Sequence, residues 1–195
     1  MLRLLFSLTS KFLFLALLKD EKCLISEQKE NFRQHSENFF PLLRQILAKN
    51  GCSLQDIEEI YFTGSPGSQT GHRISLAFGL TFQILNPKVR IYHLNSLFFQ
   101  ATKNKAISLI SIDQKKTKYH CAVYQDTQCL VEPRAIKKSE ISQVQKQFPD
   151  HHIYEDFYQK NNSKLDNSPP KKINFLANFR QLLPYFQLLK NKEFI

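Results

Sequence analysis

Two successive runs of three short strands, each followed by helical segments, constrain the fold more than any other feature of this sequence. Apolar or alternating runs bounded by polar turns predict six strands, over residues 2–9, 12–18, 22–29, 106–113, 118–125 and 128–136. The two halves share little sequence similarity, so the argument depends on the order of the elements alone. That order predicts an internally duplicated α/β protein whose two small lobes cover residues 1–103 and 104–195.

The segments that follow these strands carry helical spacing or breaker residues. Apolar side chains three and four residues apart predict a first-lobe helix that begins near Ser36 or Asn38 and ends at Gly51. The other predicted elements are a strand over 58–63, a helix from about Thr70 to Asn86, a strand over 89–93, a helix over 95–103, a helix over 138–147, a strand over 151–155, a loop over 159–172 and a last helix from 173 to Pro184. Helices therefore follow the strands in both halves.

The first eighteen residues are apolar enough to suggest a signal peptide. Lys11 interrupts the run and no small-residue cleavage site follows it, so we expect two strands here instead. No apolar run is long enough to span a bilayer. The four cysteines form no C-x-x-C pair, which argues against a zinc ribbon or a thioredoxin-like site. These features predict a cytoplasmic protein with reduced thiols and no membrane contact.

The net charge of +10 is concentrated in the second half of the chain. Residues 1–100 carry 11 basic and 8 acidic side chains, a net charge of +3, whereas residues 101–195 carry 16 and 9, a net charge of +7. Lysine pairs at 115–116, 137–138 and 171–172 supply much of this excess. Two interpretations remain open: a solvated lysine-rich surface, or a patch that helps to hold RNA through its phosphates.

Four of the five glycines lie within residues 64–79, between a predicted strand and a predicted helix. This is the usual position of a phosphate-binding loop, but the sequence matches neither the Walker A pattern nor G-x-G-x-x-G. Pro66 and Gly67 fit the two central positions of a type II turn, so we expect Gly64, Pro66 and Gly67 to shape the turn. Nucleotide binding is therefore the weaker interpretation of the glycines.

Gly71, Ser75 and Gly79 are spaced four residues apart and form a stripe of small side chains on the predicted helix. The rest of that helix is apolar on several faces, which is not typical of a surface helix. We expect it to be covered twice, by its own sheet and by something else. The second cover is either another part of the same chain or a helix of a partner that approaches along the small stripe.

The glycine-rich segment also resembles a known family signature. Over residues 66–77, nine of twelve positions agree with the Pro-Gly-Ser-Phe-Thr-Gly-Leu-Arg-Ile-Gly-Leu-Ala motif of the TsaB (YeaZ) family. Further similar positions are Thr9-Ser10, His35-Ser36-Glu37 with Pro41-Leu42, Asn95-Ser96-Leu97, Asp113 with Tyr119, and Pro184-Tyr185. The resemblance is specific over residues 35–100 and weak over 104–195.

This resemblance implies an actin-like, ribonuclease H-like duplicated fold, with a mixed sheet and helices in each lobe. It implies a non-catalytic partner of TsaD in making threonylcarbamoyladenosine next to the anticodon of tRNA, with tRNA contacted indirectly. TsaE, an ATPase, completes the complex, and ATP or ADP and metal are expected on the partner subunits and not on this chain. TsaB-like proteins pair with TsaD, or with themselves, through two first-lobe helices. The corresponding interface residues here are Ser36, Phe39, Phe40, Leu43, Leu47, Gly71, Arg73, Ser75 and Gly79.

Several positions depart from the family pattern. Leu8 stands where the family has an aspartate that actin-like ATPases place near metal and phosphate, and a leucine cannot ligate a metal. Gln69, His72 and Ser75 replace a phenylalanine, a leucine and a glycine. The six histidines show no metal-binding spacing, so we predict no catalytic residue and no metal ligand. The alternatives are a small actin-like ATP-dependent enzyme and a basic RNA-binding module.

Overall fold

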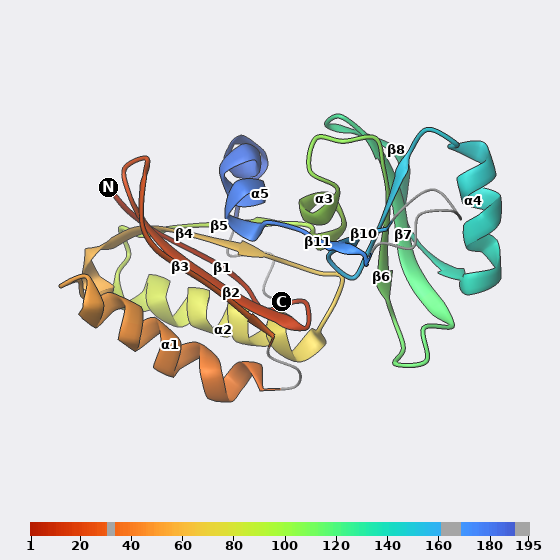
Figure 1. The fold of residues 1–195 in the computed structure, drawn as a ribbon. Helices are drawn as coiled ribbons and strands as arrows, with labels where there is room; N and C mark the ends of the chain where they lie inside the picture. The colour runs from red at the N-terminus through yellow and green to blue at the C-terminus, as the bar shows by residue number, and fades with distance from the viewer. Residues whose placement is uncertain (31–33, 161–168, 190–195) are drawn as a thin grey trace. The chain divides into compact units, whose positions relative to one another are not determined.

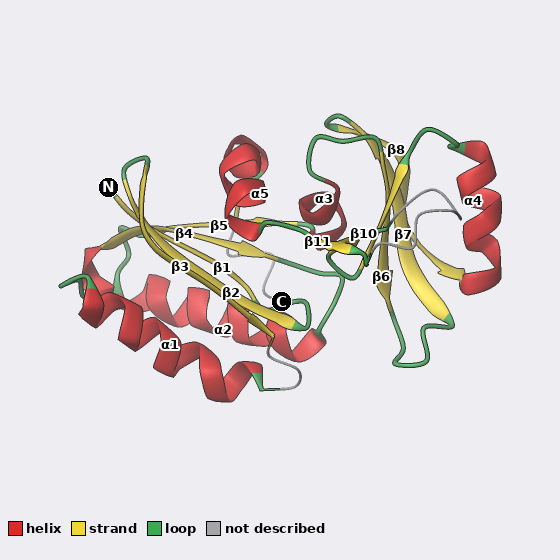
Figure 2. Cartoon of the chain, viewed as in Figure 1, coloured by secondary structure: helices red, strands yellow, loops and turns green. Residues whose placement is uncertain are grey.

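The computed structural model describes residues 1–30, 34–160 and 169–189. The chain forms two compact units, one from Met1–Leu94 together with the segment that begins at Leu183, the other from Asn95–Leu182. Figure 1 labels the elements of both units, and Figure 2 shows their secondary structure. Each unit is described by itself below. Among the described helices, none combines the length and the hydropathy needed to cross a membrane.

A six-stranded mixed sheet forms the centre of the first unit. Its order is β12-β5-β4-β1-β2-β3. The strands are β1 (Leu2–Ser7), β2 (Phe12–Lys19), β3 (Lys22–Glu30), β4 (Ile57–Thr63), β5 (Arg90–Leu94) and β12 (Gln187–Leu188). Strand β1 pairs antiparallel with β2 and parallel with β4, so the apolar N-terminal segment forms the predicted strands at the centre of the sheet.

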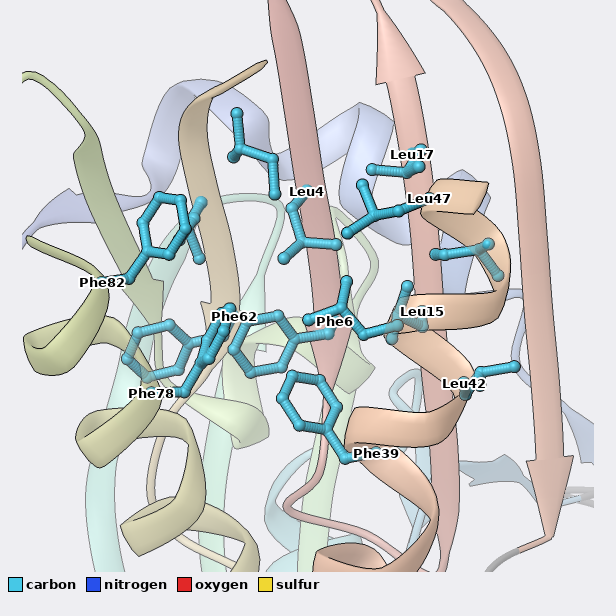
Figure 3. Close-up of a cluster of buried hydrophobic side chains, with 14 of the residues drawn as sticks. Leu4, Phe6, Leu15, Leu17, Phe39, Leu42, Leu47, Phe62, Phe78 and Phe82 are labelled. Carbon is cyan, nitrogen blue, oxygen red and sulfur yellow. The ribbon is translucent and has the colours of Figure 1, made fainter. Parts of the chain in front are cut away.

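Helices α1 (His35–Lys49) and α2 (Gln69–Leu85) cover one face of this sheet (Figure 1). The 3-10 turn η1 (Leu54–Asp56) leads from α1 into β4. Between the helices and the sheet lies a cluster of aromatic rings, drawn in Figure 3. The ring of Phe6 lies 5.0 Å from that of Phe39, 5.5 Å from that of Phe62 and 5.8 Å from that of Phe78. Burial of these rings is the main force that fixes both helices to the sheet.

The second unit repeats this strand order and the relative directions of the last four strands in it, but β10 is antiparallel to β9 whereas β5 is parallel to β4. Its order is β11-β10-β9-β6-β7-β8, and β6 pairs antiparallel with β7 and parallel with β9, as β1 does with β2 and β4. The strands are β6 (Ala106–Ser111), β7 (Lys118–Gln125), β8 (Gln128–Lys137), β9 (His152–Glu155), β10 (Tyr158–Gln159) and β11 (Lys171–Lys172). The duplication predicted from element order is therefore present in the strand pairing of the two sheets.

The helices of the second unit are shorter than α1 and α2. They are α3 (Ser96–Ala101), α4 (Ile141–Gln147, preceded by the 3-10 turn η2, Lys138–Glu140) and α5 (Phe175–Leu182). Val144 of α4 packs in a cluster with Ile107 and Leu109 of β6. Strand alternation turns Ser108 to the opposite face, where its hydroxyl donates to the carbonyl of Leu97 in α3 (2.7 Å). The sheet therefore has α4 on one face and α3 on the other.

The two units do not divide the chain where the sequence-based division at residues 103 and 104 does. Helix α3 belongs to the second unit, because the Gln100 side chain donates to the Ser108 hydroxyl and accepts from the Phe157 backbone. The last described residues belong to the first unit, because β12 pairs with β5. A two-residue strand carries no periodicity that a sequence could display. Of the predicted loop over 159–172, residues 161–168 lie outside the described residues.

The start of α1 also differs from its prediction. The helix begins at His35, with Gln34 as a cap that makes no side-chain capping bond, so neither Ser36 nor Asn38 caps it. Pro41 lies inside the helix, at its seventh residue. Gly51 follows the helix with φ of +62°, as expected of the residue that ends it.

Candidate functional site

The glycine-rich segment closes directly over the end of β1. A Cβ atom built on Gly67 would lie 2.1 Å from the carbonyl oxygen of Thr9, and one on Gly71 would lie 1.8 Å from that of Leu8. Both neighbours are backbone atoms, so no side chain can be accommodated at either glycine. Leu8 and Thr9 are buried, with 0% and 2% of their surfaces exposed. The main chain thus fills the space in front of α2 that a phosphate-binding loop leaves open.

Two backbone donors at the start of α2, the amides of Ser68 and Gly71, are bonded within the chain. The Ser68 amide donates to the Thr9 carbonyl (2.7 Å), and the Ser68 hydroxyl accepts from the Gly71 amide (3.2 Å). The hydroxyls of Ser7, Thr63 and Thr9 form a buried chain beside this contact, with O–O distances of 2.7 and 2.9 Å. A phosphate site needs free amides at the helix N-terminus. This geometry favours a structural role for the glycines over nucleotide binding.

The turn before α2 is not the predicted type II turn. The Ser65–Pro66 peptide bond is cis, whereas a proline at the second position of a type II turn follows a trans bond. Gly67 has φ of +141°, far from the value of about +80° that a type II turn requires at its third position. Gly64, Pro66 and Gly67 do form the turn, but a cis bond leaves no signature in the sequence that separates it from trans.

The small stripe of α2 faces the chain's own sheet, which corrects the prediction that it opens a helix face to a partner. Gly71, Ser75 and Gly79 are all buried. The Ser75 hydroxyl donates to the Gly71 carbonyl of its own helix (2.9 Å). A Cβ atom on Gly79 would lie 3.5 Å from the side chain of Ile91 in β5. The spacing correctly indicates a close approach, but the surface that approaches is intramolecular.

Three predicted interface residues of α1 also belong to the core. Phe39, Leu43 and Leu47 are 0%, 3% and 6% exposed and pack in the first-unit cluster, so they cannot reach a partner while the unit is folded. Ser36 is exposed. Phe40 is 50% exposed, and its ring lies 5.1 Å from that of Phe39 and partly covers the junction of α1 and α2. Of the four apolar α1 residues predicted, only Phe40 is available to a partner.

The exposed side of α2 carries apolar side chains that the site prediction did not include. Residues 73, 77, 80 and 84 follow helical spacing and lie on the side opposite the small stripe. Ile84 and Leu85 are 78% and 77% exposed, values well above those of other large apolar residues in the described chain. We call this surface the outer helix face and define it as Phe40, Arg73, Ala77, Leu80, Thr81, Ile84 and Leu85.

The sequence contains a signal for the outer helix face. Leu76, Leu80 and Ile84 recur every four residues, and whereas Leu76 packs against the core, Leu80 and Ile84 continue the series on the outer helix face. The sequence analysis predicted that α2 is covered on two sides, but it did not say which residues lie on the side away from the sheet. Arg73 is the one predicted α2 interface residue that is exposed on this face. It is the only cation among the seven residues of the face.

The described residues do not include a group of three or more side chains that could hold a metal ion. Two histidines lie beside Gly64: a Cβ atom built on this glycine would lie 3.6 Å from Nδ1 of His93 and 3.9 Å from Cε1 of His72. Burial, and to a lesser extent the nearby His93, lower the pKa of His72. The His72 imidazole is therefore neutral at pH 7, which suits packing beside the turn.

The carboxylates of the second unit take part in structural contacts. Asp113, noted in the resemblance, accepts hydrogen bonds from the Thr117 amide (3.0 Å) and hydroxyl (2.7 Å) and from the Lys118 amide (2.9 Å). These bonds lower the pKa of Asp113 and close the turn between β6 and β7. Glu155 is buried and ion-paired with Lys116 (3.0 Å) and with Lys160. Neither carboxylate is poised as a general acid or base.

Comparison with known proteins adds independent evidence. Residues 25–177, more than half of the chain, match the family model described as TsaD: tRNA N6-adenosine threonylcarbamoyltransferase. An uncharacterized protein of Mycoplasma genitalium is 32% identical over 115 residues, which is 59% of this chain and 57% of that protein. The tRNA threonylcarbamoyladenosine biosynthesis protein TsaB of Escherichia coli is 30% identical over 97 residues, 48% of this chain and 42% of that protein. The chain thus spans about half the length of the curated relatives it matches.

One solved structure shares almost the entire fold. It is described as an uncharacterized protein with similarity to the peptidase YeaZ from Pseudomonas aeruginosa, and it superposes with a TM-score of 0.68 at 14% identity. The match covers 98% of this chain and 96% of that one. Together with the strand order of the two sheets, it confirms the expected duplicated actin-like, ribonuclease H-like fold.

Proposed function

The chain belongs to the TsaD family of tRNA N6-adenosine threonylcarbamoyltransferases, among its TsaB (YeaZ) members, and from this premise we propose that it is a non-catalytic subunit of a threonylcarbamoyltransferase complex. In this proposal it pairs with a TsaD-like catalytic subunit. The complex transfers a threonylcarbamoyl group to the adenosine next to the anticodon of tRNA, in the cytoplasm. A TsaE-like ATPase joins the same complex.

The observation that carries the proposal is the outer helix face. Ile84 and Leu85 leave more than three quarters of their surfaces exposed, and Phe40 leaves half of its surface exposed. Burying an isoleucine or leucine side chain contributes about 1.5–3 kcal/mol, so a chain does not gain stability by exposing adjacent large apolar residues. An apolar centre with a single arginine is the usual composition of the buried part of a protein–protein interface.

The closed glycine segment supports the assignment of a non-catalytic role. Leu8 supplies a carbonyl that lies against Gly71, at the point where the family carries an aspartate. The amides of Ser68 and Gly71 are already bonded within the chain. We therefore propose that ATP or ADP and any metal ion bind to the TsaD-like and TsaE-like subunits. This chain then contributes surface and geometry, and contains no reacting group.

The first occupant we propose for the outer helix face is the TsaD-like subunit. Duplicated folds of this kind present equivalent helices, so α1 and α2 can pack against a pair of helices on a related partner. A homodimer through the same face is the form proposed for the chain when the catalytic subunit is absent. The two assemblies compete for one surface and therefore exclude each other.

The decisive experiment is a binding titration between the purified chain and the TsaD-like subunit of the same organism. The double variant Ile84→Glu, Leu85→Glu is expected to weaken binding at least tenfold, because two carboxylates are then buried or the contact is lost. The matched control is Leu130→Glu, Leu188→Glu, which places the same charge on exposed apolar residues of β8 and β12. Equal affinities for the two double variants would contradict the proposed interface.

A further inference from the structure

Four lysines gather at one end of the second-unit sheet, where β7 begins and β8 ends. Lys118 and Lys137 are directly opposite each other in the antiparallel pair, so their side chains lie on the same face. The Lys138 amide donates to the Thr117 carbonyl (2.8 Å), which holds the segment after β8 against the turn between β6 and β7. Lys115 lies in that turn. We call Lys115, Lys118, Lys137 and Lys138 the basic corner; all four are exposed.

The nearby carboxylates do not pair with these ammonium groups. Asp113 accepts from backbone and hydroxyl donors of the turn, and Glu140 accepts from the Lys137 amide (2.7 Å). Within the part of the chain that the structure describes, none of the four lysines has a carboxylate within ion-pair distance. The positive charge of the corner is therefore directed to solvent.

The adjacent Lys116 shows that a lysine in this turn can form ion pairs. Its ammonium group lies 3.0 Å from Glu155 and 2.7 Å from Asp156, and Lys160 pairs with the same Glu155. Like charges directly opposite each other in a sheet cost stability, so the Lys118–Lys137 pair weakens the fold slightly. Since folding does not account for four unpaired lysines beside a fully paired one, an external anion is the simplest explanation.

The adjoining edge of the sheet is not suited to bind a protein strand. Strand β8 lies at the open edge, and Pro133 removes one backbone donor from it. Two register shifts disturb its pairing with β7, and such irregularities discourage strand addition. Charge, rather than the hydrogen-bonding edge, is what this region offers to a partner.

We propose that the basic corner binds the phosphate backbone of tRNA, the substrate of the complex in which the chain is proposed to act. This inference deepens the proposed function and rests on it for the identity of the nucleic acid. Lysine ammonium groups act as mobile point charges and suit contacts with phosphates that require no base recognition. The corner then holds and orients the RNA while the partner subunit performs the chemistry.

The test is a fluorescence-anisotropy titration of an unmodified tRNA transcript with the intact chain alone, over a range of potassium chloride concentrations. Neutralising about four phosphates gives a slope of log affinity against log salt of roughly −3 to −4. The variant Lys118→Glu, Lys137→Glu is expected to weaken binding about tenfold or more at the lowest salt and to flatten the slope by about two. Lys115→Gln, Lys138→Gln gives a smaller shift in the same direction and serves if the first variant unfolds.

The matched control is Lys19→Glu, Lys22→Glu. These lysines are also opposite each other, across the β2–β3 turn of the first unit, but Asp20 and Glu21 lie between them in sequence. The control changes the net charge by the same amount. Unchanged tRNA binding in the control, with weakened binding in the corner variant, supports the proposal. Equal losses in both variants, or a flat salt response of the wild-type chain, overturn it.

Two further measurements are needed. One compares tRNA with other anions, and the other distinguishes a failure of this inference from a failure of the proposed function. Polyglutamate or anionic phosphatidylserine vesicles that bind the wild-type chain more tightly than tRNA does, at equal charge concentration, overturn the assignment to RNA. If the chain binds tRNA through the corner but does not bind the TsaD-like subunit, the proposed function fails and the inference stands. If the chain binds that subunit while both lysine variants bind tRNA as the wild type does, the inference fails and the proposed function stands.

Discussion

The two units have sheets of the same strand order, but the turns between their first two strands differ in how far they are buried. In the first unit the turn after β1 begins with two buried residues, Leu8 and Thr9, whose carbonyl groups lie against Gly71 and Gly67, and only Lys11 at its end is exposed. In the second unit the turn over residues 112–117 is longer and mostly exposed, and it carries lysines. One strand arrangement therefore supports two different surfaces.

The helices of the two units also differ, in length and in the side chains that they expose. The first unit has α1 and α2, of 15 and 17 residues, which expose Phe40 of α1 and Ile84 and Leu85 of α2. Between β8 and β9 the second unit has the 3-10 turn η2 and the seven-residue helix α4, beside a corner of unpaired lysines. The comparison teaches that the two units share the arrangement of four strands, β4-β1-β2-β3 in one and β9-β6-β7-β8 in the other, and differ in the turns and helices around them. On the proposals above, one unit serves a protein partner and the other an anion.

The largest effect on stability is expected where Gly71 packs against the main chain of the first-unit turn. Gly71→Ala places a Cβ atom against the Leu8 carbonyl, and since that neighbour is backbone of a central strand, β1 itself must shift. We expect the free energy of unfolding to fall by about 3 kcal/mol, measured by urea denaturation.

Gly79→Ala is the matched control for that variant. Its Cβ atom would meet Ile91 at an ordinary contact distance of 3.5 Å. Alanine also favours the helix over glycine, so the change in stability is expected to stay within about 1 kcal/mol, on the stabilising side. Comparable losses of unfolding free energy for the two variants would show that Gly71 does not pack against the Leu8 carbonyl as described.

A smaller effect is expected from the paired lysine of the second-unit turn. Burial would raise the pKa of Glu155, but the ammonium groups of Lys160 and Lys116 outweigh it and hold that pKa below its usual value. A carboxyl with a lowered pKa contributes stability above its unfolded-state pKa and loses it as the pH falls through the folded-state pKa. The contribution is therefore present at pH 7 and disappears in acid, below about pH 4.

Lys116→Met is expected to lower the free energy of unfolding by about 1 kcal/mol at pH 7, because Lys160 still pairs with Glu155. Urea unfolding at pH 7 and pH 3 measures the difference, which should nearly vanish at the lower pH. Lys138→Met is the control from the basic corner and should show no such pH dependence. A loss of equal size at both pH values would mean that Lys116 stabilises the turn by packing rather than by charge.

The sequence was sufficient to predict the duplicated strand order, since β1–β3 and β6–β8 have clear apolar runs and polar turns. It also placed the end of α1 at Gly51, where a positive φ requires glycine. The small stripe at Gly71 and Gly79 was recognised as a close approach, but spacing alone does not say which surface approaches. That choice depends on which side of α2 meets the sheet.

Other features could not be predicted for physical reasons. Phe39, Leu43 and Leu47 occupy one side of α1, and an apolar side looks the same in sequence whether it meets its own sheet or a partner. The exposure of Ile84 and Leu85 becomes visible only once the core is known. The pairing of β12 with β5 joins segments almost a hundred residues apart and leaves no local pattern.

The most direct test of the central claim is the threonylcarbamoyladenosine content of tRNA, measured by nucleoside mass spectrometry in cells that lack this chain. Wild-type protein is expected to restore the modified nucleoside, as is the Leu130→Glu, Leu188→Glu control. The Ile84→Glu, Leu85→Glu variant, expressed at the same level, is expected to restore little of it. Full restoration by that variant, or an unchanged content of the nucleoside in cells without the chain, would contradict the account.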